Sequence, residues 1–510
     1  MSALPAIDLA ARRTEEADVA LVPFADGQRR RCLALRAGED RFDIVLAEPR
    51  DAALRLWLEA RIRAAGHPRT RWFAAGADDI AAFLARLERE TRALDGQVAA
   101  LADAPGDDPD EGVVTLSLAG ISADESPVVR FVNGTLYDAL KARASDIHLE
   151  STAQGLTVKY RLDGVLQAVT RPEGREFADR VISRLKVLAD LDISERRIPQ
   201  DGRLKLRHAA RAIDVRVSIM PSLHGEDAVL RILDRYQIAA DERLSLAHLS
   251  FGERESAFVR QMARLPHGLF LVTGPTGSGK TTTLYGVLSE VNTGLDKIVT
   301  IEDPVEYQVQ GVLQIPVNEA KGLTFARGLR SILRHDPDKI MVGEIRDAET
   351  AQIAVQAALT GHQVFATVHA NNVFDVIGRL ATMQVDAYNL VSALNGVLAQ
   401  RLIRQLCSHC AAPAEPDAAV PDAARGGRFM LPVGCAQCRG TGYRGRRAIA
   451  QTLAMDVDMR SLIAERASPA RLRAAARERG LETLRDAALH LVREGITSLE
   501  EADRVTAAEE

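Results

Sequence analysis

A glycine-rich octapeptide has the residue types and spacing of a phosphate-binding loop. Gly274 to Thr281 fits the pattern G-x-x-x-x-G-K-[ST], follows the apolar run 269–272 and precedes a helical segment. Glycines let consecutive backbone N–H groups face an anion, and the helix N-terminus adds partial positive charge. We expect an ATP site, and the alternative is a glycine-rich turn without a ligand. The expected ATP-binding residues are Gly274, Pro275, Thr276, Gly277, Ser278, Gly279, Lys280, Thr281 and Thr282.

Three more apolar runs of this region end in polar side chains. Such runs, separated by helical segments, indicate a parallel sheet covered on both faces. Ligands of such sheets gather at the carboxyl ends of the strands, which is also the edge that holds the phosphate loop. Lys280 would reach the β- and γ-phosphates and Thr281 the Mg²⁺. We expect Glu344, directly after a strand, to order Mg²⁺ or polarise the attacking water, and a solvent-facing loop glutamate is the alternative.

The other polar residues at this edge give further candidates. His369 could contact the γ-phosphate through a charged hydrogen bond, and the role of His362 is open. The carboxylates around Pro304 could face the metal, and structural loop charge is the alternative for them. Besides Glu344 and His369, the catalytic candidates here are Glu302 and Glu306. The expected magnesium ligands are Thr281, Glu302, Asp303 and Glu344.

Four of the five cysteines form two C-x-x-C pairs separated by a proline-rich spacer of 24 residues. Two such knuckles suit a closed tetrahedral Zn²⁺ site of structural type, and disulfides are the alternative. The remaining cysteine, Cys32, has no assigned role. The expected zinc ligands are Cys407, Cys410, Cys435 and Cys438.

Composition limits the class of protein. At 510 residues the chain is too long for one core, so about three or four domains are expected. The net charge of −5 gives no electrostatic case for nucleic acid as a partner. No apolar run approaches the roughly 18 residues of a membrane span, and Asp8, Arg12 and Arg13 interrupt any signal-peptide core. We expect a cytoplasmic protein that reaches a membrane only through protein partners.

Patterning divides the chain into segments. We expect residues 1–95 to form a docking domain. By composition, 96–125 should form an acidic, flexible linker. Period-two alternation at 156–162 and 213–220 around a helical segment at 177–191 predicts a small α/β domain over 126–238. The ATPase domain is expected over 245–510, including a zinc module at 405–447 and a helical part at 455–510.

Several motifs in order resemble the secretion ATPases that power type II secretion and type IV pilus assembly (GspE/PilB-like). The resemblance is dense from Ser126 to Thr506, and the zinc cysteines resemble the secretion and assembly branches rather than the retraction ATPases. The motifs that carry it are Ala144–Glu150, Tyr160–Gly164, Arg196–Arg203, His224–Glu226, the phosphate loop, the Asp box Thr300–Tyr307, the Walker B-like Gly343–Asp347 and the His box Gly361–Ala370.

The resemblance implies a RecA-like P-loop core preceded by a smaller, PAS-like α/β domain. It also implies a homohexamer in which a neighbouring subunit's second domain covers the nucleotide, with Arg203 and Arg216 contacting phosphate in trans. Both arginines fit this by pattern, since Arg216 lies on the solvent-facing side of its strand and Arg203 follows an Asp-Gly turn. The alternative is a surface arginine without such a role, which the residues alone would favour. The implied partners are secretion-platform proteins of the inner membrane, bound through the N-terminal domain.

The leading hypothesis is a cytoplasmic ATPase that drives pseudopilus assembly and protein export by type II secretion. Type IV pilus assembly is an alternative within the class. A nucleotide-binding scaffold without turnover is an alternative of another class, although Lys280, Thr281 and Glu344 weigh against it. A nucleic-acid translocase is disfavoured by net charge and by the lack of a basic, aromatic-rich module.

Overall fold

The computed structural model describes residues 4–38, 41–66, 69–90, 114–117, 126–208, 211–233, 246–415, 421, 424 and 427–506. The chain separates into two compact units, residues 1–234 and residues 235–510. Most of the linker expected over 96–125 lies outside the described residues, as do all of its acidic positions. Within the described part, no helix is long and apolar enough to cross a bilayer.

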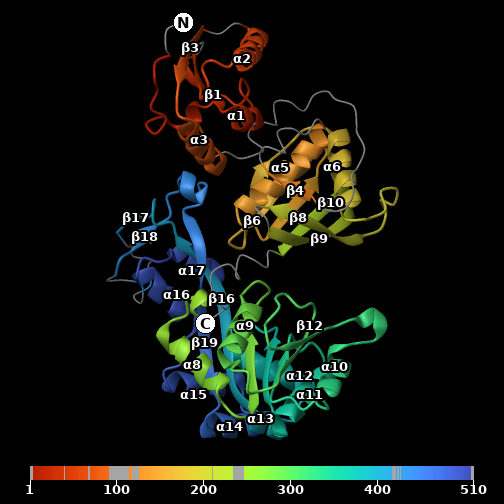
Figure 1. The fold of residues 1–510 in the computed structure, drawn as a ribbon. Helices are drawn as coiled ribbons and strands as arrows, with labels where there is room; N and C mark the ends of the chain where they lie inside the picture. Colours follow the sequence, from red (N-terminus) through yellow and green to blue (C-terminus); the bar gives the residue numbers. More distant parts are fainter. Residues whose placement is uncertain are drawn as a thin grey trace. The chain divides into compact units, whose positions relative to one another are not determined.

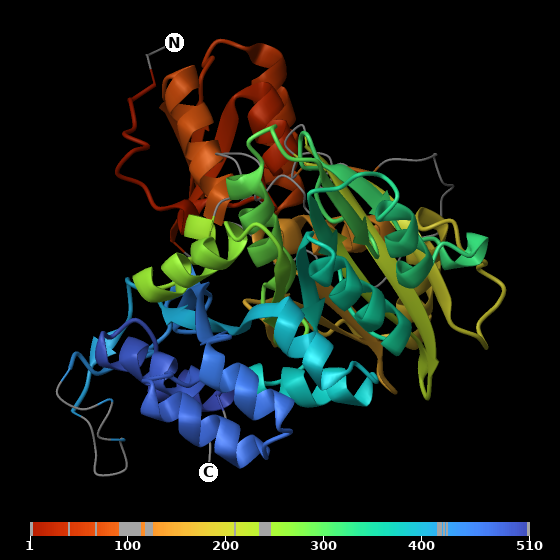
Figure 2. The ribbon, with the colours of Figure 1, turned by 90° about the horizontal axis from the view of Figure 1, so that it is seen from below.

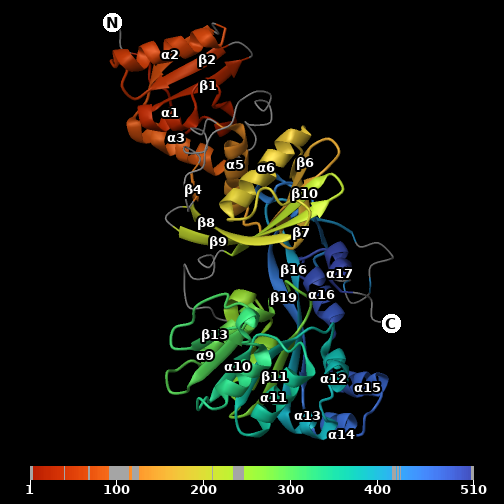
Figure 3. The same ribbon diagram turned by 90° about the vertical axis from the view of Figure 1, so that its right-hand side faces the viewer.

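The first ninety residues build a small sheet between helices. Strand β1 (Cys32–Gly38) pairs antiparallel with β2 (Arg41–Leu46), which pairs parallel with β3 (Arg69–Ala74). Helix α2 (Ala52–Ala64) begins where Asp51 accepts a hydrogen bond from Leu54 N, and it covers one face. Helices α1 and α3 lie on the other face (Figure 3). The remaining bounds are η1 (Thr14–Glu16), α1 (Phe24–Arg30) and α3 (Ala77–Glu90).

A larger sheet follows in the first unit, with α5 and α6 packed over one face (Figure 1). Its described strands run in the order β4-β8-β9-β10-β5-β6-β7. The sequence alternation has its expected effect in β9, where Ile213, Val215, Val217 and Ile219 are buried. The bounds are β4 (Val114–Leu116), α5 (Pro127–Lys141), β5 (Asp146–Ser151), β6 (Leu156–Leu162), β7 (Val165–Thr170), α6 (Arg175–Leu188), β8 (Gln200–His208), β9 (Arg211–Ser222) and β10 (Gly225–Leu233).

Strand β4 lies inside the expected linker. It pairs parallel with β8, and Leu116 is buried in the same core as α5. The ordered part of this unit therefore extends to residues that composition alone assigned to a flexible connection.

The second unit has a sheet covered on both faces, as expected. The described strands run in the order β13-β12-β14-β15-β11-β16-β19; β19 is antiparallel to β16, and the other pairs are parallel. Helices α8 and α9 pack on one face, and α10 to α13 pack on the other. The strand bounds are β11 (Gly268–Thr273), β12 (Ile298–Glu302), β13 (Leu313–Pro316), β14 (Lys339–Val342), β15 (Gln363–Val368), β16 (Leu394–Leu406) and β19 (Tyr443–Ala454).

Four of the helices on this sheet, α10 to α13, begin at polar side-chain caps. Asp347, for example, accepts from Thr350 N at 2.8 Å at the start of α11. The bounds are η3 (Leu246–Leu249), α8 (Glu253–Ala263), α9 (Lys280–Val291), η4 (Glu319–Lys321), α10 (Phe325–Ile332), α11 (Ala348–Leu359), α12 (Val373–Thr382) and α13 (Ala387–Ala393).

The C-terminal helices gather at one side of this unit (Figure 2). Helices α16 and α17 pack on β16 and β19 around Ile403, Ile449 and Val492. In the segment of chain that connects β16 to β19, β17 pairs with β18. Met430 packs there against Leu406 and Tyr443. The zinc module thus has a small core of its own. The bounds are β17 (Ala412–Pro413), β18 (Met430–Leu431), η6 (Ala436–Cys438), α14 (Val457–Ala464), α15 (Pro469–Glu478), α16 (Leu484–Arg493) and α17 (Leu499–Val505).

Candidate nucleotide site and metal centre

The phosphate loop connects the buried strand β11 to helix α9. Gly277 and Gly279 have φ angles of 79° and 87°, in the left-handed region that favours glycine. A Cβ at Gly274 would lie 2.3 Å from the carbonyl oxygen of Gln400. Larger residues at these positions would therefore change the path of the loop. Residues 275–277 are exposed, so the tip of the loop is open to a ligand.

Lys280 lies in the first turn of α9 and folds back over the loop. Its ammonium donates to the carbonyl oxygens of Gly274 and Pro275 at 2.8 and 3.0 Å. Burial lowers its pKa, and the nearby Glu344 carboxylate opposes this shift. The buried Ser278 hydroxyl has no hydrogen-bond partner among the described residues, while Thr281 is exposed. These groups form a polar cradle suited to an anion.

The Glu344 carboxylate and the His369 ring meet beside the loop. Glu344 follows β14, His369 follows β15, and His369 Nε2 lies 3.5 Å from Glu344 Oε2. Burial, and then the positive charge of Lys280, lowers the pKa of His369 against the pull of Glu344. Arg346 forms an ion pair with Glu344, and its Nη1 lies 3.9 Å from Asp303 Oδ2. The strand ends therefore bring Lys280, Glu344 and His369 to one edge, as sequence reasoning expected.

Glu302 faces away from the exposed part of this edge. It is 2% exposed, and its oxygens accept hydrogen bonds from Tyr285, Thr300 and Gln314. Burial first, and then the Glu302 contact, raises the pKa of Tyr285. Asp303 is exposed and Glu306 half-buried. The metal-binding and catalytic roles expected for this group stay predictions, and the carboxylate of Glu344 is more accessible than that of Glu302.

His362 lies at the opposite end of β15 from His369. Its Nδ1 is 3.0 Å from the carbonyl oxygen of Ala357, at the end of α11. This local contact accounts for the placement of the His362 ring, and no ligand is needed to explain it. Sequence reasoning missed Arg346 and Gln400, both in contact with groups at the site. Arg346 stands two residues after Glu344 in the sequence, and this position is the signal that could have identified it.

The two arginines expected to act across a subunit interface belong to the first unit. Arg203 on β8 and Arg216 on β9 are register partners, and Arg231 on β10 is in turn the partner of Arg216. Arg231 is paired with Asp146 at 2.9 Å, whereas Arg203 is exposed. Three guanidinium-bearing residues therefore lie side by side on adjacent strands. The trans role of Arg203 and Arg216 stays a prediction.

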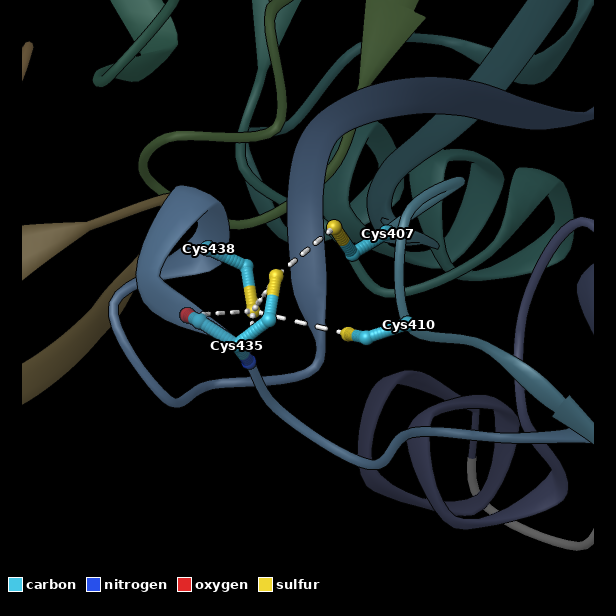
Figure 4. A group of neighbouring side chains, drawn as sticks. All are labelled: Cys407, Cys410, Cys435 and Cys438. Carbon is cyan, nitrogen blue, oxygen red and sulfur yellow. Dashed lines mark hydrogen bonds between the residues drawn. The ribbon is translucent and has the colours of Figure 1, made fainter. Parts of the chain in front are cut away.

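The four cysteines of the C-x-x-C pairs converge (Figure 4). All four sulfurs lie within 4.8 Å of one another and none is in a disulfide. The pairs Cys407–Cys435, Cys410–Cys438 and Cys435–Cys438 are 3.9, 3.7 and 3.7 Å apart. A tetrahedral Zn²⁺ with Zn–S bonds of about 2.3 Å requires sulfurs about 3.8 Å apart. The cluster could therefore hold a metal such as zinc, with no ligand position left for a substrate.

Backbone donors support the thiolate form that a metal requires. Cys438 Sγ accepts from the N–H groups of Cys435 and Gly442 at 3.1 and 3.2 Å, and Cys410 Sγ accepts from Gly434 N at 3.3 Å. Burial acts against the charged form, but the N–H groups of Cys435 and Gly442 outweigh it and lower the pKa of Cys438 to about 6. At Cys410 burial prevails over the Gly434 donor and raises the pKa to about 12. The backbone thus favours the metal-binding thiolate at Cys438.

A strand, a glycine-rich loop and a helix with a buried lysine, beside acidic strand ends of a parallel sheet, define a P-loop nucleotide-binding protein. The fold is similar to that of the Legionella pneumophila ATPase DotB, with a TM-score of 0.54 and 21% identity, covering 73% of this chain and 94% of that one. The chain belongs to the type II/IV secretion system protein family, whose model matches residues 122–504.

Two relatives show how far the similarity extends. The type II secretion system protein E of Pseudomonas aeruginosa is 47% identical over 391 residues, covering 76% of this chain and 77% of that protein. The type II secretion system ATPase E of Vibrio cholerae is 46% identical over 394 residues, covering 76% of each. The protein is therefore a secretion ATPase of the kind that sequence reasoning expected.

Proposed function

We propose that this protein hydrolyses Mg-ATP to drive pseudopilus assembly and protein export by a type II secretion system. The observation that carries the proposal is the meeting of Lys280, Glu344 and His369 beside an open phosphate loop. Similarity over three quarters of the chain to type II secretion ATPases supports the choice of machine. Hydrolysis distinguishes this proposal from a scaffold that only binds nucleotide.

Each residue has a role in the proposed reaction. Lys280 leaves the loop carbonyls to neutralise the β- and γ-phosphates, and the loop N–H groups bind their oxygens. Thr281 and Glu344 would hold Mg²⁺, which would neutralise phosphate charge. The donor set fits, since a hydroxyl and a carboxylate are hard oxygen ligands. Glu344 orients the attacking water, and His369, with its lowered pKa, contacts the γ-phosphate as a neutral donor.

The proposed assembly is a homohexamer at the cytoplasmic side of the inner membrane. Arg203 and Arg216 of a neighbouring subunit would balance the charge that develops on the γ-phosphate. Their register pairing, which puts two guanidiniums on adjacent strands, supports this role. Residues 1–95 would dock on membrane-embedded secretion proteins.

A phosphate-release assay on the purified full chain tests the proposal. We expect turnover that requires Mg²⁺ and rises with protein concentration as subunits associate. Lys280→Ala is the control that identifies the responsible site, since it should abolish phosphate binding. ATP binding without turnover, with hexamers present and membrane-partner fragments added, would contradict the ATPase and support a scaffold.

A further inference from the structure

Gln400 lies in the middle of β16, next to the phosphate loop, and is fully buried. Its Nε2 donates to the carbonyl oxygen of Ser278 at 2.6 Å, and its Oε1 accepts from the hydroxyl of Thr283 at 2.6 Å. One amide side chain thus bridges the last turn of the loop and the first turn of α9. Both bonds are short, and both ends of the amide are used.

The bond to Ser278 determines the direction of a peptide group. In a trans peptide the C=O and the following N–H point in opposite directions. Because the Ser278 carbonyl is held by the side chain of Gln400, the Gly279 N–H faces the other way, away from that side chain. Among the described residues that N–H has no protein acceptor. It is therefore a donor held ready for an anion.

Gly279 and Gly274 are packed closely against the same strand residue. A Cβ on Gly279 would lie 3.1 Å from Gln400 Nε2, and one on Gly274 would lie 2.3 Å from Gln400 O. The glycines that permit the loop conformation also permit its contact with β16. The backbone and side chain of Gln400 together form the floor of the loop.

We infer that Gln400 is a positioning residue of the phosphate loop, which keeps the Gly279 N–H directed at the nucleotide phosphates. The inference deepens the proposed function, on which it rests for the identity of the ligand. Gln400 does not touch the nucleotide in this proposal. It acts through the Ser278–Gly279 peptide, and Thr283 holds its amide in the orientation that directs Nε2 at the carbonyl.

Titration calorimetry with ADP, alongside thermal unfolding without nucleotide, separates positioning from general stability. Gln400→Leu should weaken ADP binding about ten-fold, the effect of one well-formed hydrogen bond. Gln363→Leu is the matched control, because Gln363 is equally buried and donates to the Met262 carbonyl at 3.0 Å at the far end of β15. It should lower the unfolding temperature, by less than Gln400→Leu because Gln363 Oε1 has no partner among the described residues, and leave ADP affinity within two-fold.

Gln400→Met tests the same point if the leucine variant does not fold. Methionine is unbranched and close to glutamine in length but has no N–H to donate to Ser278, so ADP binding should again weaken about ten-fold. Unchanged ADP affinity in a folded Gln400 variant, or equal weakening in Gln363→Leu, would overturn the inference. ADP binding that depends on Gln400 in a protein without ATP turnover would leave the inference standing and refute the proposed ATPase.

Discussion

The buried carboxylate of Glu501 on α17 allows a prediction about what stabilises β16, the strand that lines the nucleotide site. The carboxylate is fully buried and accepts from Arg404 N at 3.0 Å, from Arg404 Nη2 at 2.8 Å, and from Arg504 Nε and Nη2 at 2.6 Å. Burial alone would raise its pKa, but the hydrogen bonds from Arg504 and Arg404 outweigh burial and lower it. The charged form therefore ties α17 to β16.

Glu501→Gln keeps the shape and one acceptor oxygen but removes the charge. Breaking a buried ion pair costs about 3–5 kcal/mol. The side chain of Arg504 is 44% exposed, so water replaces part of the lost contact and we expect a loss of about 2–4 kcal/mol. At about 2–3 °C per kcal/mol for a unit of this size, the Tm should fall by about 4–12 °C at pH 7.5.

Scanning calorimetry of the full chain measures this loss, with Glu500→Gln as the control on the exposed side of the same helix. Because the folded pKa of Glu501 is lowered, its contribution is present above the unfolded pKa of about 4.3 and is lost as the pH falls through the folded pKa. The two proteins should therefore converge in stability in acid. A Tm decrease below about 1 °C at pH 7.5, or an equal decrease in Glu500→Gln, would refute the reasoning.

Three further predictions concern the site and its assembly. Glu344→Gln should keep Mg-ATP binding and reduce kcat by about 10²–10⁴-fold, as expected for a lost general base; near-normal turnover in single-turnover assays would shift that role to another carboxylate. Mixing Arg203→Ala chains with Lys280→Ala chains should restore part of the ATPase activity, because mixed rings contain intact interfaces; no rescue in verified mixed rings would argue against the trans role. Purified protein should contain about one Zn²⁺ per chain by elemental analysis, and Cys407→Ser or Cys438→Ser should lose the metal while still binding nucleotide; metal-free native protein with disulfides in cells would contradict the zinc assignment.

The phosphate loop was predictable because its chemistry is local. Eight consecutive residues between a strand and a helix specify the backbone, and the glycines at 277 and 279 adopt the φ angles that this conformation needs. The edge of the sheet was predictable for a similar reason, since strand ends determine where Glu344 and His369 lie. The two C-x-x-C pairs likewise identified four sulfurs that converge in space.

Strands β16 and β19 could not be predicted in the same way. The apolar residues of β16 at 394, 397, 398 and 402 repeat at a helical spacing, and the sheet environment overrides that preference. The buried contacts of Glu302 depend on which face of β12 it occupies. Alternation could have shown that Thr300 and Glu302 share a face, but not that Tyr285 lies opposite them.

Strand β16 also sets the distance between the phosphate loop and the zinc cysteines, which neither site could set by itself. Gln400 and Cys407 are seven residues apart on one continuous stretch, about 23 Å when extended. The pairing of β16 with β19 shifts register between Arg404 and Leu406, so deleting or adding one residue there would disturb this irregularity and displace one of the two side chains. The stretch between them should therefore not tolerate a change in length, and length variation among related proteins should fall elsewhere.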